Sequence, residues 1–445
     1  MDFDKGLHSK RVVTPSGIKD ATILIKNGKI TEVIEGKPPG IEGIEELGNA
    51  AVMPGIIDAH VHINEPGRTD WEGFDTATRA AAAGGVTTLI EMPLNASPVT
   101  TTAAAFEQKL AATEGKLHVN CGFYGGLVPG NLHNLPELMR AGVFGIKCFL
   151  THSGIDDFPN VTESDLQKAM PLIEKTGLPL LVHAELDSPH PKIKYHHNYP
   201  TSYHAFLESR PKTWENRAIE LMIRLCETTH CRTHIVHLST VDMMNALEAA
   251  KERLPITVET VAHYLYFAAD TIPDGQTIYK CAPPIRDDRN NFQLWLGLER
   301  KVIDFIASDH SPAPPALKAL DTGDLVKAWG GIAGLQFTLP AVWTKGAEFQ
   351  VDLADMALWL CSHPAEFLGL THKGRIEPGM DADLVVWDPE DSFVVEEKDI
   401  HFRHKITPYL GEELYGKVMQ TYVAGEKVFD RGVFVILNRG QVLLK

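Results

Sequence analysis

The chain has 445 residues, of which 44% are hydrophobic and 22% are charged, and its formal net charge is −16. These values are typical of a packed globular protein, and the length predicts one large domain with a smaller one beside it. The negative charge repels phosphate backbones and anionic lipid surfaces, so we expect neither a nucleic acid nor a membrane as a partner.

The first residues, MDFDKGLHSK, contain no apolar core of signal-peptide length, and no later run reaches the 18 apolar residues of a membrane span. We therefore predict a cytoplasmic protein. Up to residue 55, apolar and polar side chains alternate, and Asn27-Gly28 is a dipeptide typical of tight β-hairpins. This segment predicts short antiparallel strands.

Eight short apolar runs, separated by helical patterns, follow between residues 56 and 370. They are GIIDAHVHI, VTTLIEMPL, HVNCGFYGG, VFGIKCFL, LPLLVHAEL, THIVHLST, ITVETVAHYL and VIDFIASDHS. Alternating strands and helices predict a parallel sheet, and eight such units predict a (β/α)8 TIM-like barrel. From residue 371 to 445 the alternating pattern returns, so we expect residues 1–55 and 371–445 to form one small β-sandwich domain beside the barrel.

The first apolar run carries two histidines, His60 and His62, just before a Pro66-Gly67 break. Residues two apart on a strand face the same side, so the two imidazoles converge. The break puts them at the carboxyl end of the strand, where TIM barrels carry their active sites. On its own, such a pair is explained equally well by a structural role.

Four other apolar runs carry, near their ends, side chains that suit a metal site: Lys147, His183, His237 and Asp309. One functional edge that collects four histidines and a carboxylate is hard to obtain by chance, so the set predicts a metal centre. Imidazole and carboxylate ligands together suit Zn²⁺, Mn²⁺, Co²⁺ or Fe²⁺ without choosing among them.

Lys147 needs its own explanation, because an ammonium group has no lone pair for a metal. One alternative is a lysine that pairs with a carboxylate or reaches solvent. The other is a buried amine of lowered pKa that adds CO₂ and becomes a carbamate, an anionic group whose two oxygens bridge two cations. Two divalent ions with a carbamate, Asp309 and a hydroxide would leave a net positive site, which attracts a carbonyl oxygen.

With these residues the chain resembles the cyclic amidohydrolases, and among them the allantoinases, over essentially its whole length. The phrases that carry the resemblance are HINEPGRTDWEGF, EMPLN, KCFLTHSGIDDFP, SDHSPAPP and AWGGIAGLQ. The resemblance implies that His60 and His62 hold the more buried of two divalent ions, and that His183 and His237 hold the more exposed one.

The same resemblance implies that Lys147 is an N6-carboxylysine that bridges the two ions. It implies for Asp309 a double role, as a ligand of the buried ion and as the residue that transfers the proton in catalysis. Zinc is the metal we expect first, with cobalt, manganese and iron as alternatives.

The resemblance further implies that a homotetramer hydrolyses (S)-allantoin to allantoate in purine breakdown. Dihydroorotases carry Arg where this chain has Asn64, and the change favours a substrate with an uncharged substituent such as a ureido group. We expect Asn95 and Ser311 to contact the substrate, although a turn-forming Asn and a helix-capping Ser explain them nearly as well. His152 and Ser153, after the fourth run, are further candidates for the pocket wall.

Two other functions stay open at this point. A hydantoinase or dihydropyrimidinase would share the metal chemistry and act on another cyclic amide. A metal-free, non-enzymatic relative of the dihydropyrimidinases would use the fold as a scaffold, but the retention of all six candidate ligands argues against it.

Overall fold

Nine short strands form the wall of a closed barrel in the computed structural model, which describes residues 2–40, 42–188 and 196–445. The strands are β6 (Ile56–Val61), β7 (Val86–Glu91), β8 (Asn120–Phe123), β9 (Gly125–Gly126), β10 (Ile146–Phe149), β11 (Leu180–His183), β12 (Thr233–Ile235), β13 (Ile256–Val261) and β14 (Phe305–Ala307). β8 pairs with β7 and β9 pairs with β10. They are two halves of one predicted run, interrupted at Tyr124, and share one of eight positions around the wall.

The first and last strands close the barrel. Val61, at the end of β6, forms a parallel bridge with His310, and the His62 amide donates to the His310 carbonyl oxygen at 2.8 Å. The pairings that the described residues make between barrel strands are all parallel. The predicted (β/α)8 barrel is confirmed, because all eight apolar runs supply wall strands in chain order.

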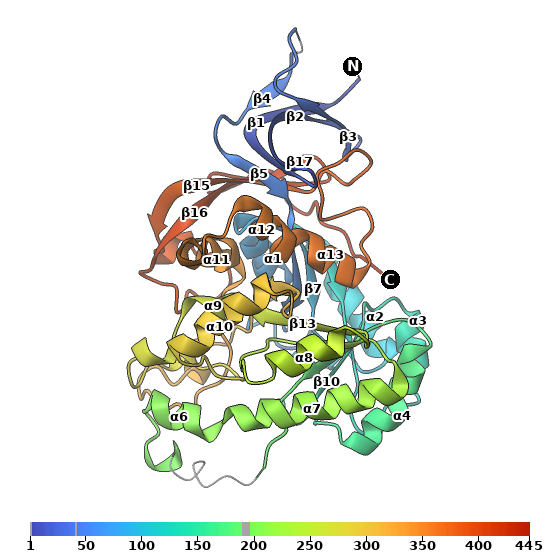
Figure 1. Ribbon diagram of the computed structural model, residues 1–445, viewed down its shortest axis with the longest axis vertical. Helices are drawn as coiled ribbons and strands as arrows, with labels where there is room; N and C mark the ends of the chain where they lie inside the picture. The colour runs from blue at the N-terminus through green and yellow to red at the C-terminus, as the bar shows by residue number, and fades with distance from the viewer. Residues whose placement is uncertain (1, 41, 189–195) are drawn as a thin grey trace.

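Helices cover the outer wall, and Figure 1 shows α4, α7 and α8 outside the strands. The α-helices are α1 (Phe74–Ala83), α2 (Ala103–Ala112), α3 (Leu135–Arg140), α4 (Glu163–Glu174), α6 (Tyr203–Ser209), α7 (Lys212–Thr229), α8 (Met244–Lys251), α9 (Ala262–Tyr266), α10 (Asp288–Glu299), α11 (Thr338–Gly346), α12 (Leu353–Ala357) and α13 (His363–Leu368). Single turns are η1 (Ala269–Thr271), η2 (Thr277–Tyr279), η3 (Pro315–Leu317), η4 (Leu335–Phe337), η5 (Ala347–Phe349), the π-helical η6 (Leu358–Ser362) and η7 (Glu397–Asp399). Thr162 and Asp165 form a capping box that begins α4.

Within the described ranges, no helix combines the length and the apolar character needed to cross a bilayer.

The two ends of the chain join in one nine-stranded sheet, at the end of the molecule away from α7 (Figure 1). Its strands are β1 (Lys5–Thr14), β2 (Gly17–Lys26), β3 (Lys29–Glu35), β4 (Ile44–Glu46), β5 (Ala51–Pro54), β15 (Leu384–Val394), β16 (Glu413–Val423), β17 (Glu426–Asp430) and β18 (Val433–Phe434). β5 is the junction, since it pairs with β1 on one side and with β15 on the other. Asn27 and Gly28 turn the β2–β3 hairpin with φ angles of 52° and 75°.

The predicted small β domain from both chain ends is therefore confirmed, and its strands are continuously hydrogen-bonded. The boundaries between this small β domain and the barrel, predicted after residues 55 and 370, stay predictions. β5 ends at Pro54 and β6 begins at Ile56, so the chain passes from the small sheet into the barrel across one residue. The last residues return to the barrel, where Val442 forms an isolated bridge with Cys121 on β8.

Candidate metal centre

Three of the predicted ligands converge at the carboxyl ends of β6 and β14. The Nε2 atoms of His60 and His62 lie 3.3 and 3.4 Å from the Oδ1 atom of Asp309. All three side chains are buried, and one ligand atom from each lies within 4.8 Å of the others. Asp309 has a φ of 43°, a left-handed conformation that is uncommon outside glycine and is typical of functional sites when it occurs.

Hydrogen bonds from behind orient both imidazoles. The Nδ1–H of His60 donates to Glu259 Oε1 at 2.5 Å, and the Nδ1–H of His62 donates to the Leu94 carbonyl oxygen at 2.9 Å. Each Nε2 atom therefore carries a lone pair that faces the Asp309 carboxylate. Burial lowers the pKa of His60, which keeps its imidazole neutral. Lone pairs that face an anion repel it unless a cation lies between them, so the cluster fits a divalent metal ion.

The other two predicted histidine ligands form a second pair beside the first. His183 Nδ1 lies 3.0 Å from His237 Nε2, and the ring centroid of His237 lies 5.4 Å from that of His60. The Nε2–H of His183 donates to Glu185 Oε2 at 2.8 Å, so its Nδ1 lone pair is directed toward His237. Burial lowers the pKa of His183, and it lowers that of His237 well below the usual range.

Lys147, on β10, lines the same cavity as the four histidines. The side chain is fully buried, and Nζ has no hydrogen-bond partner among the described residues. An ammonium group is costly to bury in this way. Burial lowers the pKa of Lys147 to about 8, which favours the neutral amine that can add CO₂. The lysine therefore has the surroundings that a carbamate needs.

The charges of the nearby carboxylates complement a cation. Burial by itself raises the pKa of Asp309, and positive charge beside it, at His60 first, lowers the pKa; with the His60 imidazole neutral, a cation between these groups is what stabilises the carboxylate. Burial also raises the pKa of Glu259, but its contacts with His60 and His234 outweigh that effect and lower the pKa to about 2. Glu259 is thus anionic at neutral pH, and Asp309 is anionic when a cation lies beside it.

A cavity of about 310 Å³ opens over this cluster, and all six predicted metal ligands line it. The four predicted substrate contacts line it as well: Asn95, Ser311, His152 and Ser153. The Ser311 hydroxyl donates to Asp309 Oδ1 at 3.2 Å. A larger cavity of about 680 Å³, between α11 and the small sheet, includes none of the predicted ligands.

Two of those four residues have hydrogen bonds that hold their own loop. The Ser153 hydroxyl donates to the Phe158 carbonyl oxygen at 2.6 Å. His152 is at the rim, with its side chain 59% exposed and its Nε2 atom 3.3 Å from Asp156. Their contact with a substrate stays a prediction.

Asn64, which we expected to influence substrate choice, lies behind the cavity wall. Its side chain is fully buried and is not among the lining residues. The Asn95 amide donates to Asn64 Oδ1 at 3.4 Å, so Asn64 contacts a residue of the cavity wall but not the cavity itself.

Four charged residues around the centre were not predicted from the sequence: Glu185, Arg210, Glu259 and Lys280. Glu185 lies two residues after His183, and Glu259 lies inside an apolar strand run. These positions are only weak indications in the sequence that the two residues belong to the centre. Arg210 and Lys280 line the cavity from connecting segments that have no periodic pattern.

The model of the Amidohydrolase family matches residues 51–428. The chain belongs to the amidohydrolase family. This amidohydrolase is 42% identical to an allantoinase of Arabidopsis thaliana, over 96% of the chain and 88% of that protein. It is also 42% identical to an allantoinase of Streptomyces avermitilis, over 97% of both chains.

Among solved structures, the amidohydrolase is similar to an L-hydantoinase (dihydropyrimidinase) from Arthrobacter aurescens. The TM-score is 0.95 at 30% identity, and the match covers 100% of both chains. The resemblance to allantoinases within the cyclic amidohydrolases is confirmed by these relatives, and so is the prediction of an amidohydrolase enzyme. Membership of the family implies divalent metal ions as cofactors, and His60, His62 and Asp309 form a candidate site for one of them.

Proposed function

We propose that the protein hydrolyses the hydantoin ring of (S)-allantoin to allantoate in purine catabolism. The relatives that are called allantoinases span nearly the whole chain and support this substrate. The observation that carries the proposal is the convergence of four histidines, Lys147 and Asp309 on one cavity at the carboxyl ends of the barrel strands. A cavity of about 310 Å³ suits a small cyclic ureide.

Two divalent ions, zinc first and cobalt, manganese or iron as alternatives, would occupy this centre. The proposed ligands of the more buried ion are His60, His62 and Asp309. Those of the more exposed ion are His183 and His237, and carboxylated Lys147 would bridge the two. When bound, such ions lower the pKa of a water molecule toward neutrality and polarise a carbonyl group.

Asp309 is the residue we propose for proton transfer. Its carboxylate accepts a proton from the water whose oxygen attacks the ring carbonyl carbon. It then delivers that proton to the ring nitrogen as the C–N bond breaks, because an unprotonated amide nitrogen is a poor leaving group. The single ring-opened product carries a carboxylate and a ureido NH₂ group, and the second proton of the water is released to solvent. Ser311, which donates to Asp309 Oδ1 at 3.2 Å, orients the carboxylate for these steps.

Asn95 and Ser311 are proposed to bind the oxygen and nitrogen atoms of the ring, with His152 and Ser153 at the entrance. The side-chain amide of Asn95 both donates and accepts hydrogen bonds, as an uncharged ureide requires. A cytosolic location and a homotetramer stay predictions.

Hydrolysis of hydantoin or dihydropyrimidine rings is the second candidate, and the similarity to the L-hydantoinase structure favours it. We would load the purified protein with Zn²⁺ and bicarbonate and follow allantoin, hydantoin, dihydrouracil and dihydroorotate by chromatography. We expect kcat/KM for allantoin to exceed the others by at least about tenfold, and the (S)-enantiomer to react first. Negligible turnover of allantoin beside dihydrouracil would contradict the proposal. Less than one bound metal ion and no hydrolysis would favour the scaffold.

A further inference from the structure

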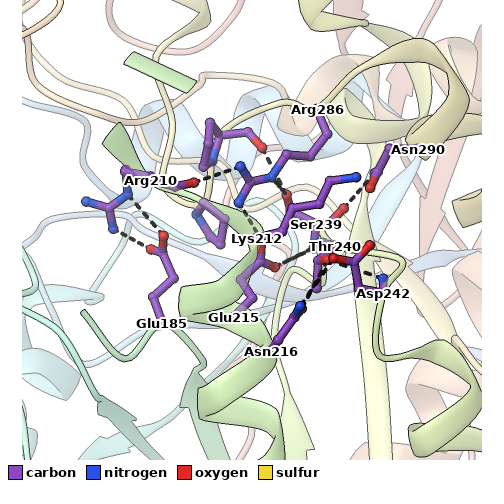
Figure 2. A network of polar contacts seen from close by, with 12 residues as sticks. Glu185, Arg210, Lys212, Glu215, Asn216, Ser239, Thr240, Asp242, Arg286 and Asn290 are labelled. Atoms are coloured by element: carbon purple, nitrogen blue, oxygen red, sulfur yellow. Dashed lines mark hydrogen bonds and ion pairs between the residues drawn. The ribbon is translucent and has the colours of Figure 1, made fainter. Parts of the chain in front are cut away.

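Two Arg–Glu pairs with buried carboxylates lie beside His183 and beside the chain that follows His237, and Figure 2 shows the two pairs in one connected network. The pairs are Arg210 with Glu185, and Arg286 with Glu215. Both glutamate side chains are almost fully buried, at 0% and 3% exposure. We call these four side chains the arginine–glutamate network. None of the four residues is a proposed metal ligand or takes part in the proposed proton transfer.

The first pair acts on His183 directly. Glu185 Oε2 accepts the Nε2–H of His183 at 2.8 Å, while the Arg210 Nε–H donates to Glu185 Oε1 at 3.1 Å. The second nitrogen of the guanidinium group also donates to Glu185 Oε2. A carboxylate held by two arginine nitrogens has a fixed orientation. Its orientation in turn decides that the Nδ1 atom of His183, and not Nε2, faces His237.

The second pair holds the chain that follows His237. Glu215 Oε2 accepts from the backbone N–H groups of Ser239 and Thr240, both at 3.1 Å. Arg286 Nη2 donates to Glu215 Oε1 at 2.8 Å, and Arg286 Nε donates to the Ser239 hydroxyl at 3.0 Å. The segment two residues beyond His237 is thus fixed to α7, the helix that carries Glu215.

One contact joins the two pairs. The Arg286 Nη1 atom donates to the backbone carbonyl oxygen of Arg210 at 2.7 Å. Support for the two histidines is therefore shared, although His183 ends β11 and His237 follows β12. The His60 and His62 imidazoles are held by other groups, Glu259 and the Leu94 carbonyl oxygen, although Glu259 Oε1 also accepts the backbone N–H of His237 at 3.3 Å.

We propose that the arginine–glutamate network positions His183 and His237 for the more exposed metal ion, and thereby sets the affinity of that ion separately from the affinity of the buried one. This inference rests on the two-ion site of the proposed function. The four residues are positioning residues, because their contacts join them to His183 and to the chain after His237; Arg210 also lines the cavity, so its effect on metal binding is measured without substrate.

Metal binding tests the proposal without reference to activity. The full-length protein would be stripped with a chelator, supplied with bicarbonate and titrated with Co²⁺ against a chromophoric competitor, which gives two stepwise dissociation constants. We expect Glu185→Ala and Arg210→Ala to weaken the second ion about 10- to 100-fold, as is usual for residues that orient metal ligands, and to leave the first ion nearly unchanged. Crystals with one equivalent of Co²⁺ should place the retained ion at His60 and His62 by anomalous scattering.

Conservative variants and a matched control separate positioning from general destabilisation. Glu185→Gln keeps one oxygen acceptor but not both contacts, so we expect the weakening of the second ion to lie between the parent and Glu185→Ala. Arg224 lies on α7 like Glu215 but forms a surface pair with Glu163, and Arg224→Gln should bind both ions as the parent does. If the alanine variants do not fold, Glu185→Gln and Arg210→Lys decide the question.

Retention of the second ion at the parent's affinity, or equal weakening of both ions, in folded variants would overturn the proposal. The substrate assay on the parent protein is a separate test. A parent protein that binds two ions but does not hydrolyse allantoin would contradict the proposed function and leave the network's role standing.

Discussion

Glu259 supports His60 from inside the barrel, with its Oε1 atom 2.5 Å from the imidazole Nδ1 and both side chains buried. The contact directs the Nε2 lone pair of His60 at Asp309. We expect Glu259→Ala to weaken the more buried metal ion about 10- to 100-fold, because the imidazole loses its fixed tautomer and orientation. Dialysis followed by metal analysis measures this, with the surface variant Glu163→Gln as the control. A Glu259→Ala protein that keeps two tightly bound ions would show that the contact is not needed.

Lys147→Ala should abolish hydrolysis, because the carbamate that we propose to bridge the two ions cannot form. Short-chain carboxylic acids such as acetate or propionate should restore part of the activity, since their two oxygens can replace the carbamate in the space left by the side chain. Rates measured with and without added acid check this. Full activity of the variant without any acid would rule out the bridge.

Formation of the carbamate should depend on pH in a defined direction. Burial lowers the pKa of Lys147 to about 8, and the amine reacts only after it loses its proton, so the reactive fraction grows as the pH rises. At a fixed concentration of dissolved CO₂, the rate at which the metal-free protein regains activity with Zn²⁺ should rise about tenfold from pH ~6 to ~7 and level off above pH ~8. A rate that continues to rise nearly tenfold per pH unit from pH ~8 to ~10 would indicate an unperturbed lysine.

Asp309→Asn should lower kcat about 100- to 10,000-fold, because the amide cannot accept and return the proton. Steady-state kinetics on the metal-loaded variant measure the effect, and metal analysis of the same sample shows whether the ions remain. Activity within about twofold of the parent would assign the proton transfer to another group.

Lys109 and Glu91 form an ion pair in which both side chains have 0% exposure. Lys109→Met leaves the Glu91 carboxylate buried without its cation, and we expect a loss of about 3–5 kcal/mol in the free energy of unfolding. The double variant Lys109→Met with Glu91→Leu should recover most of that loss, since an apolar pair can replace a buried ion pair. Urea denaturation of the metal-free proteins compares them. A single variant as stable as the parent would contradict the expectation.

The barrel could be predicted because its strands leave a direct trace in the sequence. Each apolar run is short, is bounded by a helical pattern, and ends where the fold places its active site, so His60, His62 and Asp309 could be assigned to one edge before any contact was known. The Asn27-Gly28 hairpin was predictable for the same local reason, because the dipeptide tolerates the positive φ angles of its turn.

The supports of the centre could not be predicted in this way. Glu259 reaches His60 across 199 positions of the chain, and Arg210 approaches Glu185 from the end of α6. Such contacts depend on how strands and loops meet in space, and no periodicity encodes them. The direction of the Ser153 hydroxyl toward Phe158 is a further example, because it follows from the path of one loop.

We propose that two cations, joined by carboxylated Lys147, perform the hydrolysis. A crystal structure of a fully active preparation, with anomalous data collected at the zinc edge, tests it most directly. We predict two anomalous peaks, one beside His60 and His62 and one beside His183 and His237, with density for a carboxyl group on Lys147 between them. A single peak or none, with an unmodified lysine in protein of full activity, would contradict the account.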